Sequence, residues 1–509
     1  MKLSQLIEGL NIITISGGTS GEVSSLCFSA NRCEAQSLFV AIPGLKNDGH
    51  DFIDEAISRG AQYIVYEKDR KIPSSVTAIK VSGSRRALGI LSRNYFGHPS
   101  ASLTLIAVMG TNGKTTISYL LESIFKEAGL KCGVLGTVNY RYNDKVYDAP
   151  NTTPESYEMQ RILRAMADDG VTHVVAEVSS HAVDLKRVDD CDFDLGIFTN
   201  LTRDHLDYHV TMENYYQAKK RFFAEILPGS RKVHAQKMVV NADDEYGRRI
   251  LREVSLPAVT YGIERDCAIR SSVYDLSLNG ITAEINLAGT RFPVTSPLIG
   301  KFNLYNILAA AGAAFILHIP APVIKKGVES LSHVPGRLES VTSAEDFNVF
   351  VDYAHTDDAL RRVLQNLSEL KKNKIITVFG CGGNRDRGKR PLMGEAATRF
   401  SDVTIITSDN PRQEDPMDII SEIETGIDGR DVKKNEPDNL KINDGGRIYT
   451  VIPERKKAIE AAINAAGKAD IVLIAGKGHE DYQILGTEKT PFDDCIVARQ
   501  ILKSRSQLK

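Results

Sequence analysis

The feature that most constrains this chain is a glycine-rich stretch, Gly110-Thr-Asn-Gly-Lys-Thr-Thr116, between an apolar run and a helical pattern. Glycine lets a backbone wrap around phosphate, a helix start offers free N–H groups, Lys114 adds a cation, and Thr115 can bind Mg²⁺. Val108 stands where the full Walker pattern has its first glycine, so the loop is a shortened variant. An ordinary tight turn is the alternative. The context favours a phosphate-binding loop at the edge of a parallel α/β sheet.

Apolar and helical patterns divide the 509 residues into three units, the number that this length suggests. The first, residues 1–103, alternates short apolar runs with a helical pattern and ends in a turn-rich stretch. The second, 104–335, contains the glycine-rich loop and repeated strand and helix patterns, which indicate a parallel sheet. The third, 336–509, alternates in the same way. We predict an α/β protein with a small N-terminal domain, a central P-loop ATPase domain and a C-terminal Rossmann-like domain.

The charge balance argues against nucleic acid or an anionic membrane as the main partner. Lys and Arg number 63 and Asp and Glu 65, a formal net charge of −2, whereas both partners need a large positive field. No run reaches the roughly 18 apolar residues of a membrane span. The seven cysteines are scattered without a Cys-x-x-Cys pair, which is typical of isolated thiols in a reducing compartment. We expect a cytoplasmic monomer without a disulfide or zinc site.

Polar side chains gather where two further apolar runs of the central unit end, at Glu177 and at His205. The carboxyl ends of parallel strands share one edge of a sheet, so both side chains should lie near the phosphate loop. Nucleotide-bound Mg²⁺ needs oxygen and nitrogen ligands there. A lone histidine is more often structural than a ligand, but two such groups at equivalent strand ends favour a metal site. Lys219, followed by two more basic residues, indicates by itself only a solvated charged face.

Three strand ends in the third unit are rich in glycine and charge. They are residues 380–390, residues 408–412 and residues 476–480. Guanidinium groups pair bidentately with carboxylates, and acidic side chains hold ammonium groups. These stretches therefore predict a site for a zwitterion. An internal network of surface ion pairs is the alternative.

Six motifs, in their order and spacing, resemble those of the Mur ligases, the ATP-dependent amide-forming family of bacterial cell-wall synthesis. They are Gly-Thr-Asn-Gly-Lys-Thr-Thr at 110, Glu-Val-Ser-Ser-His at 177, Asp-His-Leu-Asp at 204, Phe-Asn-Leu-Tyr-Asn at 302, Gly-Arg-Leu-Glu at 336 and Asp-Tyr-Ala-His at 352. Asn151-Thr-Thr-Pro154 and Asp409-Asn-Pro-Arg412 are similar to stretches of the members that add the third stem-peptide residue. The Asp-Asn-Pro-Arg form resembles that of enzymes choosing meso-diaminopimelate over L-lysine.

The resemblance implies a ligase with three substrates. The γ-phosphoryl group of ATP would pass to the D-glutamyl carboxylate of UDP-N-acetylmuramoyl-L-alanyl-D-glutamate, and an amine of meso-diaminopimelate would then displace phosphate. Lys114 and Mg²⁺ would neutralise charge during transfer. Arg385 and Arg412 would meet the distal carboxylate of diaminopimelate, and Glu480 its distal ammonium. With lysine bound we expect a buried guanidinium to stay unpaired, at a cost on the order of 2–5 kcal/mol.

The resemblance also implies roles for single residues. Lys219 matches a lysine that the family carries as a CO₂-derived carbamate, which would turn a cation into a ligand for a second Mg²⁺ and would replace the solvated-face interpretation. The implied catalytic residues are Lys114, His205 and Lys219, and the metal ligands are Thr115, Glu177, His205 and carbamylated Lys219. ATP would be bound by Gly110, Thr111, Asn112, Gly113, Lys114, Thr115, Thr116, Asn303, Arg337 and Asp352. The UDP-muramoyl substrate would be bound by Asn151, Thr152, Thr153, Ser179 and Arg187. Diaminopimelate would be bound by Arg385, Asp409, Asn410, Pro411, Arg412, Gly476 and Glu480.

Three positions depart from the family pattern. Ser29-Ala-Asn31 replaces an Asp-Ser-Arg motif at the uridine site, Leu185 a common glutamine, and Asp357 a usual proline. None of them is assigned to phosphoryl transfer. A folylpolyglutamate-synthetase-like ligase would share the ATP machinery, but the arginine-bearing turn at 409–412 favours the Mur type. A non-catalytic nucleotide-binding protein is disfavoured, because binding alone would not require the whole metal and charge set.

Overall fold

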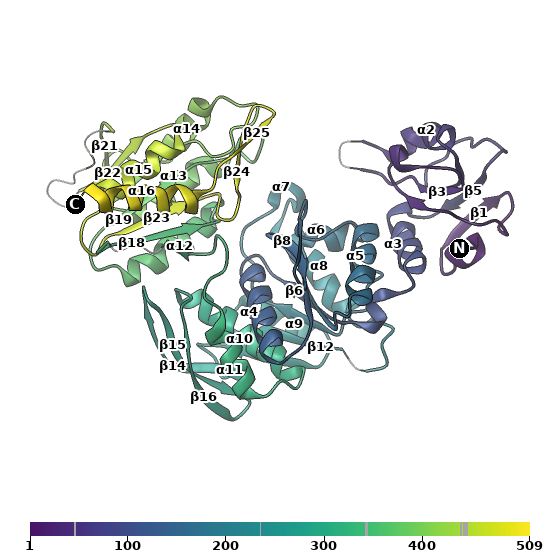
Figure 1. Cartoon of the computed structure of the whole chain (residues 1–509), viewed down its shortest axis with the longest axis horizontal. Helices are drawn as coiled ribbons and strands as arrows, with labels where there is room; N and C mark the ends of the chain where they lie inside the picture. The colour runs from purple at the N-terminus through teal and green to yellow at the C-terminus, as the bar shows by residue number, and fades with distance from the viewer. Residues whose placement is uncertain (45–46, 235, 342–344, 438–439, 441–445, 509) are drawn as a thin grey trace.

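The computed structural model describes residues 1–44, 47–234, 236–341, 345–437, 440 and 446–508. The described strands form sheets of five, eleven and seven strands in chain order, and a separate two-stranded sheet. Figure 1 shows three lobes, with the purple N-terminal unit and the green-to-yellow C-terminal unit on either side of the central one. The predicted three-part α/β architecture is confirmed. The limits at residues 103/104 and 335/336 stay predictions.

The N-terminal sheet has the order β1-β5-β4-β3-β2, with only β1 antiparallel to its neighbour. Its elements are α1 (Leu3–Leu6), β1 (Ile12–Ser16), β2 (Leu26–Cys27), η1 (Ala30–Arg32), β3 (Ser37–Val40), η2 (Gly49–Phe52), α2 (Ile53–Ser58), β4 (Ala61–Tyr66), β5 (Thr77–Val81), α3 (Ser84–Tyr95) and η3 (Pro99–Ser102). Arg86 and Arg93 of α3 form ion pairs with Asp190 of the central unit. Charged contacts therefore tie this unit to the next one.

The central sheet has the order β16-β15-β14-β13-β12-β11-β6-β10-β7-β8-β9. In the part of this order that runs from β14 to β7, neighbouring strands are parallel. The hairpins at the two margins, β15–β16 and β8–β9, pair antiparallel. The strands are β6 (Thr104–Met109), β7 (Cys132–Leu135), β8 (Asn139–Tyr142), β9 (Lys145–Asp148), β10 (His173–Glu177), β11 (Leu195–Phe198), β12 (Lys237–Asn241), β13 (Ala258–Gly262), β14 (Ile269–Ser277), β15 (Gly280–Leu287) and β16 (Thr290–Ser296). The predicted parallel sheet is thus the middle of a larger mixed one.

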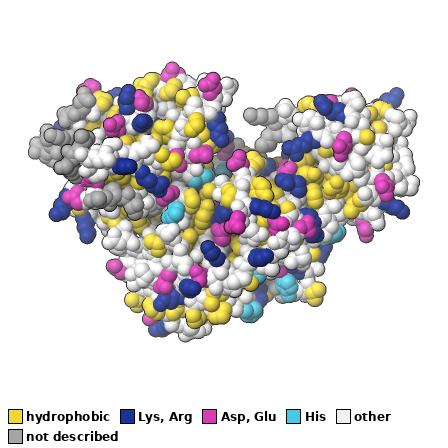
Figure 2. All heavy atoms as spheres, in the orientation of Figure 1, with side chains coloured by type: hydrophobic (Ala, Val, Ile, Leu, Met, Phe, Trp, Pro, Cys, Tyr) yellow, Lys and Arg dark blue, Asp and Glu magenta, His cyan; other side chains and the backbone are white. Residues whose placement is uncertain are grey.

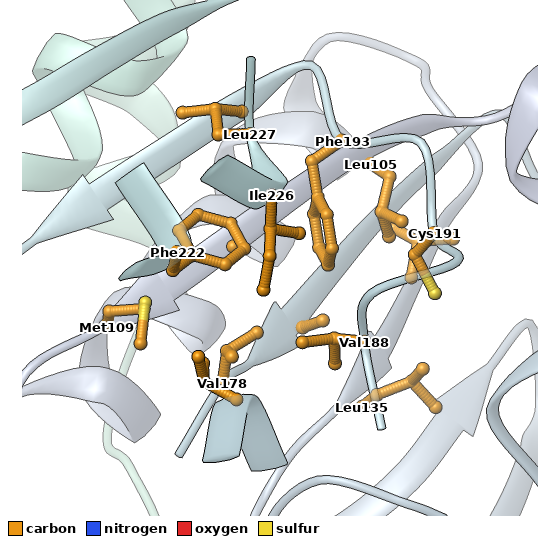
Figure 3. Close-up of a cluster of buried hydrophobic side chains, with 14 of the residues drawn as sticks. Leu105, Met109, Leu135, Val178, Val188, Cys191, Phe193, Phe222, Ile226 and Leu227 are labelled. Atoms are coloured by element: carbon orange, nitrogen blue, oxygen red, sulfur yellow. The ribbon is translucent and has the colours of Figure 1, made fainter. Parts of the chain in front are cut away.

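Helices cover both faces of this sheet. They are α4 (Lys114–Glu127), α5 (Ser156–Asp168), α6 (Ser180–Asp184), α7 (Leu206–His209), α8 (Met212–Arg221), the π-helix η4 (Phe222–Ile226), α9 (Glu245–Glu253), α10 (Lys301–Ile316) and α11 (Ala321–Ser330). Leu105, Ala107 and Met109 of β6 face one core, where Figure 3 shows Phe193 and Phe222 among the packed side chains. The two residues between them face the opposite core, under α4, α10 and α11. Because both faces are buried, the strand is apolar without alternation.

The C-terminal sheet has the order β17-β18-β23-β19-β20-β22-β21, parallel except for β17. Its elements are β17 (Glu339–Ser340), β18 (Asn348–Asp352), α12 (Asp357–Leu370), β19 (Ile375–Phe379), α13 (Lys389–Phe400), β20 (Val403–Ile406), α14 (Pro416–Glu424), β21 (Val432–Lys434), β22 (Arg447–Val451), α15 (Arg455–Ala465), β23 (Ile471–Ala475), the hairpin β24 (Tyr482–Leu485) and β25 (Glu488–Pro491), and α16 (Asp494–Leu508). The ends of β19, β20 and β23 lead into the three charged stretches.

The surface agrees with the balanced composition. On the face in Figure 2, dark-blue basic and magenta acidic side chains are interspersed. In the described part of the chain, no helix combines the length and apolar character needed to cross a membrane.

Candidate active site

The loop between β6 and α4 adopts a conformation that requires glycine at both ends. Gly110 has φ 150° and Gly113 φ 91°, both in the region that L side chains rarely adopt. A Cβ at Gly110 would lie 1.7 Å from Thr199 Oγ1, and one at Gly113 would lie 2.4 Å from Asn306 Oδ1. The backbone can therefore approach a ligand closely at the N-terminus of α4, as a phosphate site requires.

Lys114, the first residue of α4, turns its side chain back over this loop. Its Nζ donates to the carbonyl oxygens of Gly110 and Thr111, at 3.0 and 2.9 Å. Burial lowers the pKa of Lys114, an effect that nearby Glu177 opposes. Within the described residues, no carboxylate forms an ion pair with Lys114. A half-buried cation compensated only by carbonyl dipoles is a strong attractor for polyphosphate.

Glu177, the last residue of β10, brings a buried carboxylate to the same edge. Its oxygens accept from Thr115 Oγ1 at 3.1 Å, from Thr137 Oγ1 at 2.8 Å and from the Thr137 amide at 3.2 Å. These donors are all neutral, and no described Lys or Arg pairs with the carboxylate. A hydroxyl and an uncompensated carboxylate are hard oxygen donors, the chemistry that Mg²⁺ prefers.

Lys219 reaches the loop from the segment after β11. His205, from the same segment, has a side chain that is 43% exposed. Desolvation lowers the pKa of His205 to about 4, against the opposing effect of Asp204, so its imidazole is neutral at physiological pH. Lys219 is 1% exposed, and its Nζ donates to the Gly110 carbonyl at 2.9 Å. Burial, reinforced by Lys114, lowers its pKa well below the ordinary value. The solvated-face interpretation of Lys219 is therefore wrong.

A cavity of about 530 Å³ lies over the loop. It is lined by residues 111–116, Glu177, His205, Thr152, Ser179, Arg337 and Asp352, among others. Arg337 crosses from the C-terminal unit and donates to Thr115 Oγ1 at 3.3 Å. The described residues contain no cluster of three or more His, Cys, Asp or Glu side chains able to hold a metal ion, so ligand and hydroxyl oxygens would have to complete a Mg²⁺ site.

Asn303 is placed differently from the expectation. Its side chain is buried, donates to the Ile299 carbonyl at 2.9 Å and accepts from Asn306 Nδ2 at 2.9 Å. Asn306, one turn later on α10, lines the cavity instead, together with Phe302 and Tyr305. Asn303 therefore holds the side chain of Asn306 and does not itself line the cavity. Sequence reasoning missed these three residues, although helical spacing around Asn303 could have indicated them.

Of the residues expected at the UDP-muramoyl substrate, Thr152 and Ser179 line this cavity. Asn151, Thr153 and Arg187 are not among its lining residues. Thr152 Oγ1 contacts Thr137 Oγ1 at 3.0 Å, and Thr153 Oγ1 donates to the Glu177 carbonyl at 2.8 Å. Ser179 caps α6, and Arg187 donates to the Thr153 carbonyl at 3.2 Å. The side chain of Asn151 is exposed. Through Thr137 and Thr153, these contacts lead to Glu177 at the end of β10.

A second cavity, of about 380 Å³, lies against the C-terminal unit. Its lining includes Arg385, Asp409, Asn410, Arg412, Gly476 and Glu480, whereas Pro411 is buried and is not among the lining residues. Arg412 has φ 54°, and its Nη1 donates to the Gly383 carbonyl at 2.9 Å. The hairpin β24–β25 fixes the turn, because the Arg412 amide donates to the Ile484 carbonyl at 3.1 Å.

Two expectations about this cavity need correction. Arg385 is exposed, so the cost of an unpaired buried guanidinium can arise only at half-buried Arg412. In addition, Asp409 and Glu480 already belong to an internal ion-pair network centred on Lys477. The internal network that was the alternative therefore exists, and the zwitterion site stays a prediction on the same residues. Lys477 was overlooked in the sequence, where it stands between two glycines.

The two cavities meet. Asp204, His205, Tyr353, His355 and Thr356 line both of them. A group activated beside the phosphate loop can therefore be approached from the side of Arg412 and Glu480. Asp357, at the site of the usual proline, opens α12 after its cap Thr356, where an acidic residue suits the helix dipole.

Comparisons with known proteins agree with this geometry. Three family models match: "Mur ligase family, catalytic domain" over residues 22–95, "Mur ligase middle domain" over 108–314 and "Mur ligase, glutamate ligase domain" over 336–478. The UDP-N-acetylmuramoyl-L-alanyl-D-glutamate–2,6-diaminopimelate ligase of Geobacter metallireducens is 43% identical over 494 residues, 97% of each chain.

Solved structures show the same fold. One titled as a UDP-N-acetylmuramoyl-L-alanyl-D-glutamate–2,6-diaminopimelate ligase matches with a TM-score of 0.70 and 30% identity over 99% of both chains. A Mycobacterium tuberculosis folylpolyglutamate synthase covers 81% of this chain and 93% of its own, with a TM-score of 0.60 and 16% identity, a likeness of fold alone. With full-length relatives above 40% identity and a model for each unit, the chain belongs to the Mur ligase family.

Proposed function

We propose that this enzyme joins meso-diaminopimelate to UDP-N-acetylmuramoyl-L-alanyl-D-glutamate in an ATP-dependent reaction of peptidoglycan precursor synthesis. One observation carries the proposal: the cavity over the phosphate loop and the cavity beside Arg412 share Asp204 and His205 in their lining. A ligase needs this arrangement, because the activated carboxyl group and the incoming amine must meet away from water.

In the first step the D-glutamyl carboxylate attacks the γ-phosphorus of ATP, and ADP leaves. Lys114 neutralises charge on the transferring group, and the amides at the start of α4 hold the phosphates. Bound Mg²⁺ would supply Lewis-acid neutralisation of the triphosphate. Thr115, Glu177, neutral His205 and Lys219 in its carbamate form are the residues that would hold it. The neutral amine of buried Lys219 is the form that CO₂ requires for carbamate formation.

In the second step the amine of diaminopimelate attacks the acyl phosphate, and the tetrahedral intermediate expels phosphate. The distal zwitterion is held by the turn 409–412, with Arg412 toward the carboxylate and Glu480 toward the ammonium. Arg385, on the exposed rim, adds a second positive charge. L-Lysine lacks the distal carboxylate and leaves Arg412 unpaired, so discrimination rests chiefly on that residue.

The experiment is a phosphate-release assay with the UDP-muramoyl dipeptide and ATP, comparing meso-diaminopimelate, L-lysine and no amine. We expect amine-dependent phosphate release with diaminopimelate and at least tenfold lower kcat/KM with lysine. Equal use of both amines would contradict the specificity, and no release with either would contradict the reaction. Because one chain supplies all the proposed binding residues, we also propose that a cytoplasmic monomer is the working form.

A further inference from the structure

Lys477 lies beneath the amino-acid end of the site and has no role in the reaction described so far. Its Nζ is 3.4 Å from Asp409 Oδ1, 3.1 Å from Asn410 Oδ1 and 3.5 Å from Glu480 Oε2. The side chain is fully buried. The three partners line the cavity, and Lys477 lies behind them. One ammonium group therefore contacts three of the residues proposed to receive diaminopimelate.

The local backbone directs Lys477 inward. It follows β23, between Gly476 with φ 118° and Gly478 with φ 56°. A Cβ at Gly478 would lie 2.6 Å from the Tyr353 Cβ. These two glycines allow a tight turn that carries a long cation under the ends of neighbouring strands. Because the backbone needs glycine on both sides of Lys477, the Lys477 side chain has a defined position.

The charged groups around Lys477 carry one negative charge in excess. Asp409 and Glu480 share this single ammonium, while the next cation inward, Arg455, is already paired with buried Asp494 at 2.6 Å. The excess charge suits the distal ammonium of a zwitterion. Without Lys477, two carboxylates would face each other in a poorly solvated site, and protonation would remove the charge that the ligand needs.

Lys477 also fixes the orientation of an amide. Asn410 Oδ1 accepts from Lys477 Nζ at 3.1 Å and from the Ile484 amide at 3.0 Å. With the oxygen so engaged, Asn410 Nδ2 donates to Glu480 Oε2 at 2.9 Å. The Glu480 carboxylate thus accepts from Lys477 itself and from Asn410, whose orientation is set by Lys477 together with the Ile484 amide.

We propose that Lys477 is a positioning residue for the distal zwitterion, acting through Glu480, Asn410 and Asp409 without touching the substrate. This inference rests on the proposed function and extends it to a residue that sets amino-acid affinity. Lys477 should therefore affect the binding of diaminopimelate only, because the residues proposed to bind the nucleotide and the muramoyl substrate lie at or beside the other cavity.

The test compares Lys477→Met, Lys477→Gln and Lys477→Arg in the full-length enzyme. Lys489→Met is the matched control, because Lys489 is an exposed lysine on the adjacent hairpin. We expect the Met and Gln variants to raise the KM for meso-diaminopimelate at least 20-fold and the KM for ATP and for the dipeptide less than twofold. The Arg variant should recover part of the loss, and the control should match the wild type.

A pH profile separates positioning from a general loss of structure. The charged or titratable groups facing Glu480 are Asp409, Lys477, Arg455, Tyr353 and Tyr482. Burial, reinforced by Asp409, raises the pKa of Glu480, and Lys477 opposes that rise. In Lys477→Met the acid limb of kcat/KM for diaminopimelate should therefore move to higher pH. Mere structural damage would lower the whole profile without moving the limb.

Each outcome has a distinct meaning. An unchanged KM for diaminopimelate, or an equal rise for all three substrates, overturns the role of Lys477. Wild-type enzyme without diaminopimelate-dependent phosphate release overturns the proposed function, and this inference with it. If the Met variant is insoluble, the Gln variant gives the same comparison, because it keeps a hydrogen-bond donor while removing the charge.

A second, independent site lies in the N-terminal unit, where Cys27 and Cys33 face each other. Their Sγ atoms are 2.8 Å apart, and both residues are buried. The expectation of isolated thiols is therefore wrong for this pair, although all seven cysteines are reduced. Cys27 ends β2 and Cys33 follows η1, so the pair closes a turn carrying Arg32, which forms an ion pair with Glu158 of the central unit at 3.6 Å.

We infer that this pair is a modification site that a hydroperoxide converts to a disulfide. The Cys33 thiolate attacks a peroxide oxygen and gives a sulfenic acid and water or alcohol. The Cys27 thiol then attacks that sulfur, forms the S–S bond and releases water, so that two thiols lose two electrons to one peroxide. The hydrogen bond from Cys27, and Arg59 nearby, lower the pKa of Cys33, which favours the attacking thiolate.

The test treats the full-length protein with excess hydrogen peroxide and maps its peptides without reductant. Trypsin cleaves after Arg32, so a disulfide keeps the two flanking peptides linked until reductant separates them. We expect this link in the wild type and in the matched control Cys132→Ser, and its loss in Cys27→Ser. Unlinked peptides after treatment, sulfinic acid at either residue, or an intermolecular dimer would overturn the inference.

Discussion

The nucleotide cavity and the amino-acid cavity differ in how the protein balances their charges. Around the phosphate loop, half-buried Lys114 and buried Lys219 donate to backbone carbonyls and have no carboxylate partner among the described residues. Nearby Glu177 accepts, within the same part of the chain, only from neutral donors. In the C-terminal unit, Asp409 and Glu480 already share Lys477. The protein thus leaves the charges of the nucleotide cavity without counter-charges. In the amino-acid cavity it leaves only one negative charge without a counter-charge.

This difference indicates what each ligand must bring. Desolvated amines and an unpaired carboxylate are costly, so the nucleotide cavity becomes favourable only when a polyphosphate, a metal ion and CO₂ supply the missing charges. The amino-acid cavity is organised before its ligand arrives, which lowers the ordering cost of binding for a ligand whose charges match it. Removing a charge should therefore affect stability in opposite directions at the two cavities.

The largest expected effect is at Lys114. Lys114→Met should lower phosphate release by about 10³-fold or more, because the transferring group loses its cation. The same change should leave Tm unchanged or raise it, since a half-buried amine without a counterion is removed. Turnover is measured by phosphate release, and Tm is measured by thermal unfolding. The control is Lys126→Met, at the exposed end of the same helix, and near-normal turnover in Lys114→Met would refute the phosphate-loop assignment.

The next effect is at Arg412. Arg412→Ala should raise the KM for meso-diaminopimelate by about 10²-fold and that for ATP hardly at all, because only the distal carboxylate loses its partner. Steady-state kinetics with each substrate varied in turn decides this. Arg430→Ala, at an exposed arginine of the same unit, is the comparison variant. Similar changes in both constants would mean that the two cavities do not divide recognition as proposed.

A smaller loss is expected at Lys219. Lys219→Ala should lower kcat by roughly 10–10²-fold, because a metal-supporting group is lost, and added acetate or formate should restore part of it. Neighbouring Lys220, which pairs with Glu253 at 2.7 Å, provides the control Lys220→Ala. Indifference of kcat to Lys219→Ala would remove the carbamate from the mechanism. A loss without rescue by carboxylates would leave only a structural role for the amine.

The same contrast explains what could be predicted from the sequence. The phosphate loop depends on local order, strand then glycine then helix, so residues 110–116 were identifiable from the pattern alone. Burial of Lys219 depends on how α8 packs, and its charged neighbours pointed the other way. Two of the partners of Lys477, Asp409 and Asn410, lie more than 60 residues earlier in the sequence. Asn306 lies against Gly113, nearly 200 residues earlier. Contacts of this range follow from sheet order, which no local pattern contains.

The smallest effect concerns the segment that joins the two cavities. Val210, just after α7, has φ 67° and is 73% exposed, a strained conformation for a β-branched residue. Val210→Gly should relieve about 1 kcal/mol of strain and raise Tm by about 2 °C, with the KM values within twofold of wild type. Exposed Val146, in strand β9, is the control, because Val146→Gly should lower Tm instead. A decrease of Tm in both variants would mean that Val210 is not strained, and that its positive φ costs the folded protein nothing measurable.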